Sequence, residues 1–172
     1  MQPTKRDGPQ VLAVVECAGA TSPRYCPTGR HGARRQNGAS KAVAYSFTVS
    51  DRISATPRAV YDAWMSSDQH GAMTGDRAQI DPCPGGVFQA WGGYITGTTL
   101  ELEPSRRIVQ SWRTSDFDPD DPDSRIEVLL EPAGDGTLLT LHHTNIPDGQ
   151  SGYEQGWRDN YFDPMRAFFT RP

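Results

Sequence analysis

The stretch "DFDPDDPDSRIE", from Asp116 to Glu127, carries a dense set of side chains that could bind a metal ion. Asp116, Asp118 and Asp120 alternate, and Glu127 stands at the twelfth position, which is the carboxylate spacing of a calcium-binding helix–loop–helix. Such a loop requires a helix on each side and a glycine at its sixth position. Here the sixth position is Asp121, and the flanking residues have the pattern of strands. We therefore interpret the stretch as a solvated hairpin connection and predict no metal site.

Two adjacent histidines, His142 and His143, are of a type that serves in catalysis and in metal binding. Neighbouring residues of a strand point to opposite faces of the sheet, so the two imidazoles cannot serve one site without a bulge. His143 shares the parity of the apolar residues Leu139 and Leu141 and is expected to point inward. Two interpretations of His143 stay open: a polar contact inside a pocket, or a core histidine held by a neighbouring hydrogen bond.

The cysteines do not match a known metal or nucleophile motif. Cys17, Cys26 and His31 have the spacing of neither a zinc finger nor a zinc ribbon, and a fourth ligand is missing. Cys83 lies between two prolines, with no flanking basic residue to activate a thiolate. Three cysteines are an odd number without a CxxC pair, and no clear secretory signal is present, so we predict a cytoplasmic protein. We predict no catalytic residue, no metal and no cofactor.

Length and charge limit the classes of function. The 172 residues are consistent with one domain. No apolar run approaches the roughly 20 residues needed to span a membrane. Residues 1–41 carry seven Lys or Arg and two Asp or Glu, whereas residues 42–172 carry ten and nineteen. An acidic body has little attraction for a phosphate backbone, so we predict no nucleic-acid partner.

A change in composition divides the chain. Residues 1–40 are rich in Gly, Pro, Arg, Ser and Gln without a sustained apolar period, which predicts a disordered basic extension. Residues 41–172 are predicted to form one domain. This domain begins with a strand over residues 44–55, and Thr56 then offers an N-cap for an amphipathic helix. The polar stretch that follows, which includes His70, is expected to be an exposed connector.

Alternating apolar residues predict about five consecutive strands after this connector. Their predicted ranges are 85–91, 94–103, 107–113, 124–132 and 137–144. Gly92 and Gly93 fit a two-residue hairpin turn, because both central positions of the tightest hairpins require a positive φ. Short turns make consecutive strands antiparallel neighbours. The parity of the apolar residues changes after Gly97, which predicts either a bulge at Gly97 or a sheet that is partly covered on both faces.

The last predicted element is a long amphipathic helix. Ser151 and Glu154 have the spacing of a capping box. Large side chains then recur along one face of the helix, namely Trp157, Tyr161, Pro164 and Phe168. Pro164 lacks a backbone donor and is expected to kink the helix. A strongly apolar helix has to cover one face of the sheet, so the sequence predicts an α+β fold with a curved antiparallel sheet around a long C-terminal helix.

Five motifs carry a resemblance to a known superfamily: "PGGVF", "YITGTTLELEP", "RRIVQSWR", "GDGTLLTLHHTNIP" and "YEQGWRDNYFDPM". With them, residues 45–170 resemble the helix-grip superfamily of START-like and SRPBCC proteins. Within that superfamily they are similar to the C-terminal domain of activators of the heat-shock protein 90 ATPase. The eukaryotic activators also carry a separate N-terminal domain with a stimulating motif rich in Asn, Trp and His, and residues 1–40 do not resemble it.

Helix-grip proteins often hold an apolar cavity between the sheet and the terminal helix, and the resemblance implies such a cavity here. The predicted ligand-binding residues are aromatic side chains and one histidine: Trp64, Phe88, Trp112, His143, Trp157 and Tyr161. The alternative is that these side chains fill an ordinary core, since each aromatic side chain can bury roughly 150–250 Å².

Three functional hypotheses follow from these residues and from the resemblance. The first is a protein that binds a small apolar or amphipathic ligand and has a stress-related role. The second is an adaptor that contacts a chaperone of the 90-kDa heat-shock class through the sheet edge or the terminal helix. The third is an enzyme of the cyclase or hydrolase kind that the superfamily includes, with His143 as general base. The absence of a nucleophile motif from the sequence favours a protein that is not an enzyme.

Overall fold

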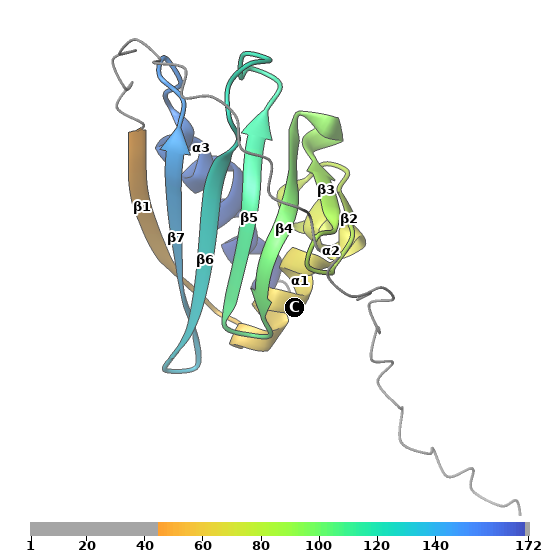
Figure 1. Cartoon of the computed structure of the whole chain (residues 1–172). Helices are drawn as coiled ribbons and strands as arrows, with labels where there is room; N and C mark the ends of the chain where they lie inside the picture. Colours follow the sequence, from red (N-terminus) through yellow and green to blue (C-terminus); the bar gives the residue numbers. More distant parts are fainter. Residues whose placement is uncertain (1–44, 171–172) are drawn as a thin grey trace, which may run out of the picture. The chain divides into compact units, whose positions relative to one another are not determined.

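Seven antiparallel strands form one curved sheet in the computed structural model, which describes residues 45–170. The strands are β1 (Tyr45–Ile53), β2 (Gln79–Ile80), β3 (Val87–Ala90), β4 (Ile95–Glu103), β5 (Arg107–Thr114), β6 (Ser124–Ala133) and β7 (Gly136–Ile146). Their order across the sheet is β1-β7-β6-β5-β4-β3-β2 (Figure 1). The predicted meander is confirmed, with β2 as an additional short strand. The predictions for residues 1–40, including Cys17, Cys26 and His31, lie outside the described residues.

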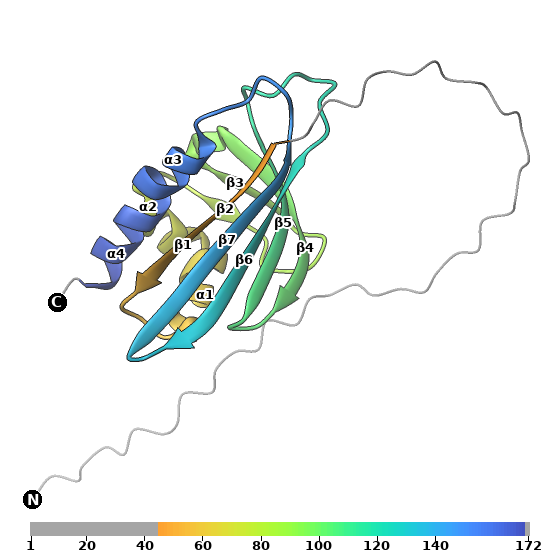
Figure 2. The same ribbon diagram turned by 90° about the vertical axis from the view of Figure 1, so that its left-hand side faces the viewer.

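Helices cover one face of the sheet, as Figure 2 shows. They are α1 (Pro57–Met65) and α2 (Ser67–Thr74), followed at the other end of the domain by α3 (Tyr153–Trp157), a π-helical turn (Arg158–Phe162) and α4 (Asp163–Phe169). The last three form one continuous C-terminal helical stretch along the sheet (Figure 2). The predicted α+β fold is confirmed. No helix in the described part of the chain is long and apolar enough to cross a lipid bilayer.

The core lies between the sheet and the helices. Every second residue is buried from Ser124 to Leu130 of β6 and from Thr137 to His143 of β7. These inward residues include Ile126, Val128, Leu130, Leu139 and Leu141. Val60 of α1 and Met165 of α4 belong to the same buried cluster from the helix side. The apolar residues at every second position of the sequence therefore form the buried face of these strands, as expected for a sheet that is covered on one side.

The stretch predicted to be an exposed connector is the helix α2. The Ser66 hydroxyl accepts a hydrogen bond from the Gln69 N–H as an N-cap, and Gly75 ends the helix with a φ of 88°. His70 is only 3 % exposed, and its Nδ1 donates to the Trp64 carbonyl at 2.9 Å. The prediction was wrong because this helix is stabilised by its caps and its tertiary contacts, while its composition gives almost no amphipathic period.

The C-terminal helical stretch begins without the predicted capping box. Gly152 occupies the N-cap position in the left-handed conformation, with a φ of 81° and no side-chain cap hydrogen bond. Ser151 and Glu154 therefore do not form reciprocal caps. Instead, the hydroxyl of Tyr153 contacts the Thr114 hydroxyl of β5 at 2.9 Å. A tertiary contact thus anchors the helix where a local one was predicted.

Pro164 changes the helix by widening it. Because proline lacks an N–H, Pro164 cannot donate to the carbonyl of Asn160 one turn earlier. The chain adopts a π turn at this point, in which the Asp163 N–H donates to the carbonyl of Arg158. The π turn includes Tyr161, whose ring is buried toward the sheet.

The turn between β3 and β4 is longer than the predicted two-residue hairpin. Ala90 pairs with Ile95, so the residues from Trp91 to Tyr94 form the connection. Trp91 adopts a φ of 54°, and Gly92 and Gly93 follow with 61° and 97°. The prediction was wrong because the glycine pair indicated only two residues with a positive φ. A tryptophan rarely adopts a positive φ, so the sequence did not indicate that Trp91 belongs to the turn.

Gly97 marks a close approach of two strands. A Cβ at Gly97 would overlap the carbonyl oxygen of Ser111 and come within 2.6 Å of the Phe88 ring. The register of β4 and β5 shifts later, between Thr99 and Glu101. The change of parity in the sequence therefore reflects a bulge beyond Gly97.

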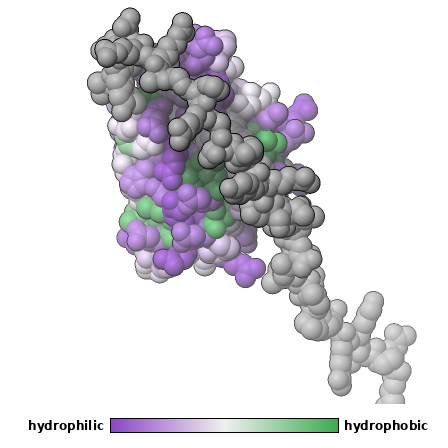
Figure 3. Space-filling view, in the orientation of Figure 1, coloured by the Kyte–Doolittle hydropathy of each residue, from purple (hydrophilic) through white to green (hydrophobic). Residues whose placement is uncertain are grey.

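The outer face of the sheet is largely hydrophilic where Figure 3 displays it. Arg107 on β5 lies 2.6 Å from the carboxylate of Glu101 and 2.5 Å from that of Glu127. These hydrogen bonds raise the pKa of Arg107 above its usual range. Glu127, the last carboxylate of the acidic stretch, is therefore engaged in an ion pair on the outer face.

Candidate ligand-binding site

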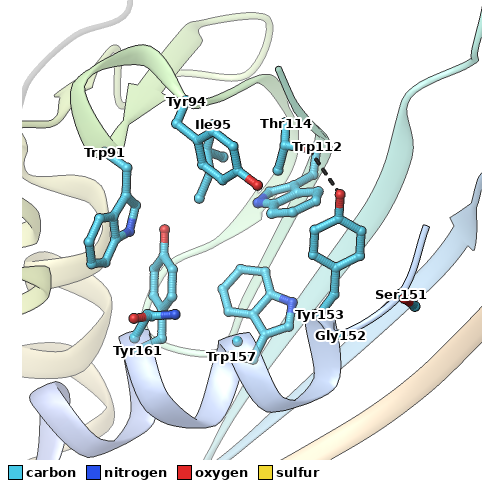
Figure 4. A pocket seen from close by; sticks show the side chains of 12 residues that line it. Trp91, Tyr94, Ile95, Trp112, Thr114, Ser151, Gly152, Tyr153, Trp157 and Tyr161 are labelled. Atoms are coloured by element: carbon cyan, nitrogen blue, oxygen red, sulfur yellow. Dashed lines mark hydrogen bonds between the residues drawn. The ribbon is translucent and has the colours of Figure 1, made fainter. Parts of the chain in front are cut away.

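A cavity of about 300 Å³ lies between β4 and β5 on one side and the C-terminal helical stretch on the other (Figure 4). Its lining consists of aromatic rings and a few small polar residues: Trp91, Tyr94, Ile95, Trp112, Thr114, Ser151, Gly152, Tyr153, Gly156, Trp157, Asn160 and Tyr161. The sheet, a turn and a helix that are far apart in the sequence supply these side chains. The volume is at the lower end of the range of small-molecule pockets, about 300–1,000 Å³.

Trp157 and Tyr161 form the helix side of the cavity. They lie one helical turn apart, and their ring centroids are 4.4 Å from each other. Trp64 of α1 stacks on Trp157, with centroids 6.2 Å apart and planes inclined by 17°. Since Trp64 does not line the cavity, it supports Trp157 from behind.

His143 holds Trp157 from the sheet. The Trp157 Nε1–H donates to His143 Nδ1 at 3.1 Å. The Ser124 hydroxyl donates to the carbonyl of Trp112 at 2.6 Å, so it accepts from His143 Nε2 at 2.8 Å. Both imidazole nitrogens are therefore used, which assigns the neutral Nε2–H tautomer. Burial lowers the pKa of His143 to about 3.

These contacts give His143 a structural role. A general base requires a free nitrogen lone pair within reach of the proton it removes. The lone pair of His143 Nδ1 is occupied by the indole N–H of Trp157, and the imidazole is not part of the cavity lining. The geometry therefore does not support the hypothesis of an enzyme with His143 as its base.

Trp112 forms the sheet side of the cavity. Its ring centroid lies 5.7 Å from that of Trp157 and 5.1 Å from that of Tyr153. Its indole Nε1 is buried and has no hydrogen-bond partner among the described residues. An unpaired buried donor costs about 1–3 kcal/mol of stability. In Figure 4 this nitrogen lies on the edge of the indole that faces the other lining rings.

A series of hydrogen bonds forms a polar rim around one end of the cavity. The Tyr94 hydroxyl donates to the Asp116 carboxylate at 2.6 Å. The Tyr153 hydroxyl donates to Gln150 Oε1 at 2.6 Å and accepts from the Thr114 hydroxyl at 2.9 Å (Figure 4). The amide of Gln150 donates in turn to the Asp116 carbonyl at 2.9 Å. The rim thus joins the beginning of α3 to the end of β5.

The rim hydroxyl of Tyr94 keeps its proton at neutral pH. Burial, together with the hydrogen bond to the Asp116 carboxylate, raises the pKa of Tyr94 to about 12. The Asp116 carboxylate is occupied by this bond and does not line the cavity.

Trp91 lies at the turn side of the cavity in a strained conformation. A non-glycine residue in the left-handed region costs about 1–3 kcal/mol and persists only when its surroundings hold it. The hydroxyl of Tyr161 points toward this end of the cavity (Figure 4). Burial raises the pKa of Tyr161, and a hydrogen bond with Trp91 opposes part of that shift. The strained residue therefore contacts another lining residue.

The structure brings together three of the six predicted ligand-binding residues: Trp112, Trp157 and Tyr161. Trp64 and His143 lie behind this wall and hold Trp157. Phe88 packs over Gly97 and borders a separate open hollow of about 350 Å³. That these side chains bind a ligand stays a prediction.

Sequence reasoning missed several lining residues, among them Trp91, Tyr94, Thr114 and Tyr153. Tyr153 lies four residues before Trp157 on the same helix face, so the helical period could have indicated it. Trp91 and Tyr94 flank the glycine pair, and aromatic residues beside a turn were a signal. Thr114 gave no signal, because its position depends on the pairing of β5 with Ile95 of β4.

Arg113 organises the acidic stretch between β5 and β6. Its guanidinium donates to the carbonyl of Asp118 at 3.1 Å and contacts the carboxylate of Asp123 at 3.1 Å. No group of three or more His, Cys, Asp or Glu side chains among residues 45–170 could hold a metal ion. The stretch is the connection between two antiparallel strands, and its first carboxylate, that of Asp116, belongs to the rim.

The fold and the position of the cavity define a helix-grip protein. An HSP90 activator from Plasmodium falciparum has a TM-score of 0.67 at 23 % identity, over 74 % of this chain and 97 % of that one. CalU16 from Micromonospora echinospora has a TM-score of 0.61 at 28 % identity, over 74 % of this chain and 77 % of that one.

The model of the family "Activator of Hsp90 ATPase homolog 1-like protein" matches residues 54–170, and the chain belongs to this family. An "Activator of 90 kDa heat shock protein ATPase homolog" from Dictyostelium discoideum is 26 % identical over 134 residues, 76 % of this chain and 34 % of the relative. "Activator of 90 kDa heat shock protein ATPase homolog 1" from Homo sapiens is 24 % identical over 130 residues, 75 % of this chain and 38 % of the relative. The chain thus spans little more than a third of the length of these relatives.

Proposed function

We propose that this protein contacts a chaperone of the 90-kDa heat-shock class. The observation that supports the proposal is the family match, which covers residues 54–170 and thus most of the described fold. Relatives from Dictyostelium discoideum and Homo sapiens are named activators of the ATPase of that chaperone. Because this chain spans little more than a third of their length, the proposal concerns contact with the chaperone and a change in its ATPase rate.

Titration of the full chain into a 90-kDa heat-shock chaperone tests this proposal. Calorimetry should show saturable binding with a Kd of about 1–50 µM, the range of many transient contacts. The ATPase rate of the chaperone should change in the same range of concentration, whereas an equal amount of an unrelated protein should leave it unchanged. No heat of binding together with a constant ATPase rate would contradict the proposal.

The cavity favours a second function, the binding of a small and largely apolar ligand. It is lined by aromatic rings from the sheet, the turn and the helix, and charged side chains are absent from its lining among the described residues. Pockets of this kind bury most of a small ligand and orient it with a few polar groups. Here the unpaired Trp112 Nε1 and the hydroxyls of Tyr94 and Tyr161 are polar groups of that kind.

Native mass spectrometry of the purified full chain tests the second function. We expect a discrete increase in mass from a co-purified ligand. The variant Gly156→Leu should lose it, because a Cβ at Gly156 meets only the Asn160 side chain at 3.9 Å and the added side chain extends from the cavity wall. An equal mass increase in both proteins would place the ligand elsewhere and contradict this function for the cavity.

A further inference from the structure

We propose that the cavity selects a small, neutral, aromatic ligand whose hydrogen-bond acceptor is bound by the indole N–H of Trp112. This inference rests on the second proposed function, the binding of a ligand in the cavity. It assigns the chemical class of that ligand and the residue that recognises it.

A comparison of three buried indole N–H groups near the cavity indicates that the ligand carries a hydrogen-bond acceptor. Trp157 Nε1 donates to His143, and Trp64 Nε1 donates to Gln110 at 3.3 Å. Trp112 Nε1 is equally buried but lacks a partner among the described residues. Buried donors in folded proteins are nearly always paired, so this one is explained by a group that the ligand supplies.

The position of this donor also restricts the acceptor. Trp112 is 3 % exposed, and in Figure 4 its nitrogen lies on the edge of the indole that faces the other lining rings. Because this nitrogen is buried, a neutral and compact acceptor such as a carbonyl oxygen fits the site better than a charged group, which would lose its hydration there.

The preference for an aromatic ligand comes from the geometry of the walls. The Trp112 ring is inclined by 42° to Trp157 and by 84° to Tyr153. Trp112 contacts both of these rings, with centroids 5.7 Å and 5.1 Å away, and the three together present faces and edges to a ring that lies beside them in the cavity. Face and edge contacts are the two arrangements that aromatic pairs prefer. The cavity of about 300 Å³ accepts one or two fused rings.

The preference for a neutral ligand comes from the charges around the cavity. An aromatic cage can also bind a quaternary ammonium group. A cation, however, has no lone pair for the Trp112 N–H, and the lining holds no Asp or Glu side chain. An anion would find no Lys, Arg or His side chain in the lining.

A matched pair of probes tests the inference on the full chain. 1-Indanone and indane have nearly the same shape, but only 1-indanone carries a carbonyl acceptor. Each is titrated to about 0.8 mM, near the Kd that ligands of about ten non-hydrogen atoms reach. The tryptophan indole N–H signals are followed by two-dimensional NMR. Trp112→Phe assigns the Trp112 signal and removes the donor while it keeps a ring. Tyr45→Phe, which removes an exposed hydroxyl outside the lining, is the control.

We expect 1-indanone to shift the Trp112 indole N–H signal downfield and to bind about three- to tenfold more tightly than indane, as one added hydrogen bond predicts. Trp112→Phe should remove this difference, and Tyr45→Phe should keep it. If both probes bind equally and the Trp112 signal does not respond to the carbonyl, the inference is wrong while ligand binding stands. If neither probe binds, both are wrong. Binding of tetramethylammonium in preference to 1-indanone would also overturn the inference.

Discussion

At the scale of single residues, His143 and Trp112 are in opposite situations. His143 uses both ring nitrogens, one toward Trp157 and the other toward Ser124, and it is fully buried. Trp112 lies beside it, with ring centroids 4.7 Å apart, and its N–H has no partner among residues 45–170. The histidine therefore stabilises the wall of the cavity, whereas the tryptophan N–H is the donor that we propose a ligand satisfies.

Lowering the pH should destabilise the protein through His143. Its pKa is about 3 in the folded protein, whereas an unfolded chain has a histidine pKa of about 6.5. Between these values the unfolded state binds the proton and the folded state does not, so the free energy of unfolding falls as the pH falls. From about pH 7 to about pH 5 we expect a loss of about 2 kcal/mol from His143. Urea unfolding at both pH values, followed by tryptophan fluorescence, measures it.

Two glutamine variants separate His143 from other titrating groups. Burial also lowers the pKa of His70, which adds to the loss with the same sign. His143→Gln should remove the part of the pH dependence of the free energy of unfolding that comes from the protonation of His143. His142→Gln, on the opposite face of the same strand, should keep the contribution of His143 to the pH dependence. A wild-type stability that is constant across this window would contradict a neutral buried His143.

The Ser124 hydroxyl should contribute strongly to stability. Ser124→Ala removes the acceptor of the His143 Nε2–H and the donor to the Trp112 carbonyl, both buried. We expect a loss of about 2 kcal/mol in the free energy of unfolding. Ser50→Ala, which removes only an exposed contact with Thr140, is the matched control and should change stability by less than about 0.5 kcal/mol. Equal effects of the two variants would show that the buried network does not hold the wall.

At the scale of elements, the pairing of β3, β4 and β5 depends on a missing side chain. A Cβ at Gly97 would overlap the carbonyl oxygen of Ser111, which is backbone and cannot turn aside. Gly97→Ala should therefore lower the free energy of unfolding by about 1–3 kcal/mol or more. Gly156→Ala in α3 is the control, and it should stabilise the protein by up to about 1 kcal/mol because its Cβ is unobstructed and the position is helical. Thermal unfolding of the two variants measures the difference.

The strands and the covering helices could be predicted because burial on one face imposes a regular period. Ile126, Val128 and Leu130 alternate along β6, and the aromatic residues of the C-terminal helix recur once per turn. Helix α2 could not be predicted, since its contacts come from distant elements and not from its own pattern. The left-handed Trp91 and the π turn before Pro164 also depend on tertiary packing.

At the scale of the whole molecule, the sequence indicated which aromatic residues would lie between the sheet and the C-terminal helix. It did not indicate which of them would border the cavity. Trp64 and Trp157 have the same residue type and are both buried, yet only Trp157 borders the cavity. The difference arises because Trp64 stacks on the side of Trp157 that faces away from the cavity and is bonded there to Gln110 of β5. The cavity depends on the sheet, the turn between β3 and β4 and the C-terminal helical stretch together, so no local pattern of the sequence predicts it.

The family membership and the cavity suggest two activities that one variant can separate. Gly156→Leu places a side chain in the cavity from its helix wall and leaves both edge strands of the sheet, β1 and β2, unchanged. We expect it to abolish ligand binding and to leave the effect on a 90-kDa heat-shock chaperone within about twofold of the wild type. Loss of both activities in a variant that unfolds like the wild type would show that the chaperone contact depends on the cavity.

Titration of 1-indanone into the wild type and into Gly156→Leu tests most directly whether the cavity is a binding site. The wild type should bind one molecule saturably with a Kd of about 0.1–1 mM, as about ten non-hydrogen atoms in an apolar pocket predict. The variant should bind at least about tenfold more weakly, since its side chain takes the place of the ligand. Equal binding by both proteins, or no binding by the wild type, would contradict the assignment of this cavity as a ligand site.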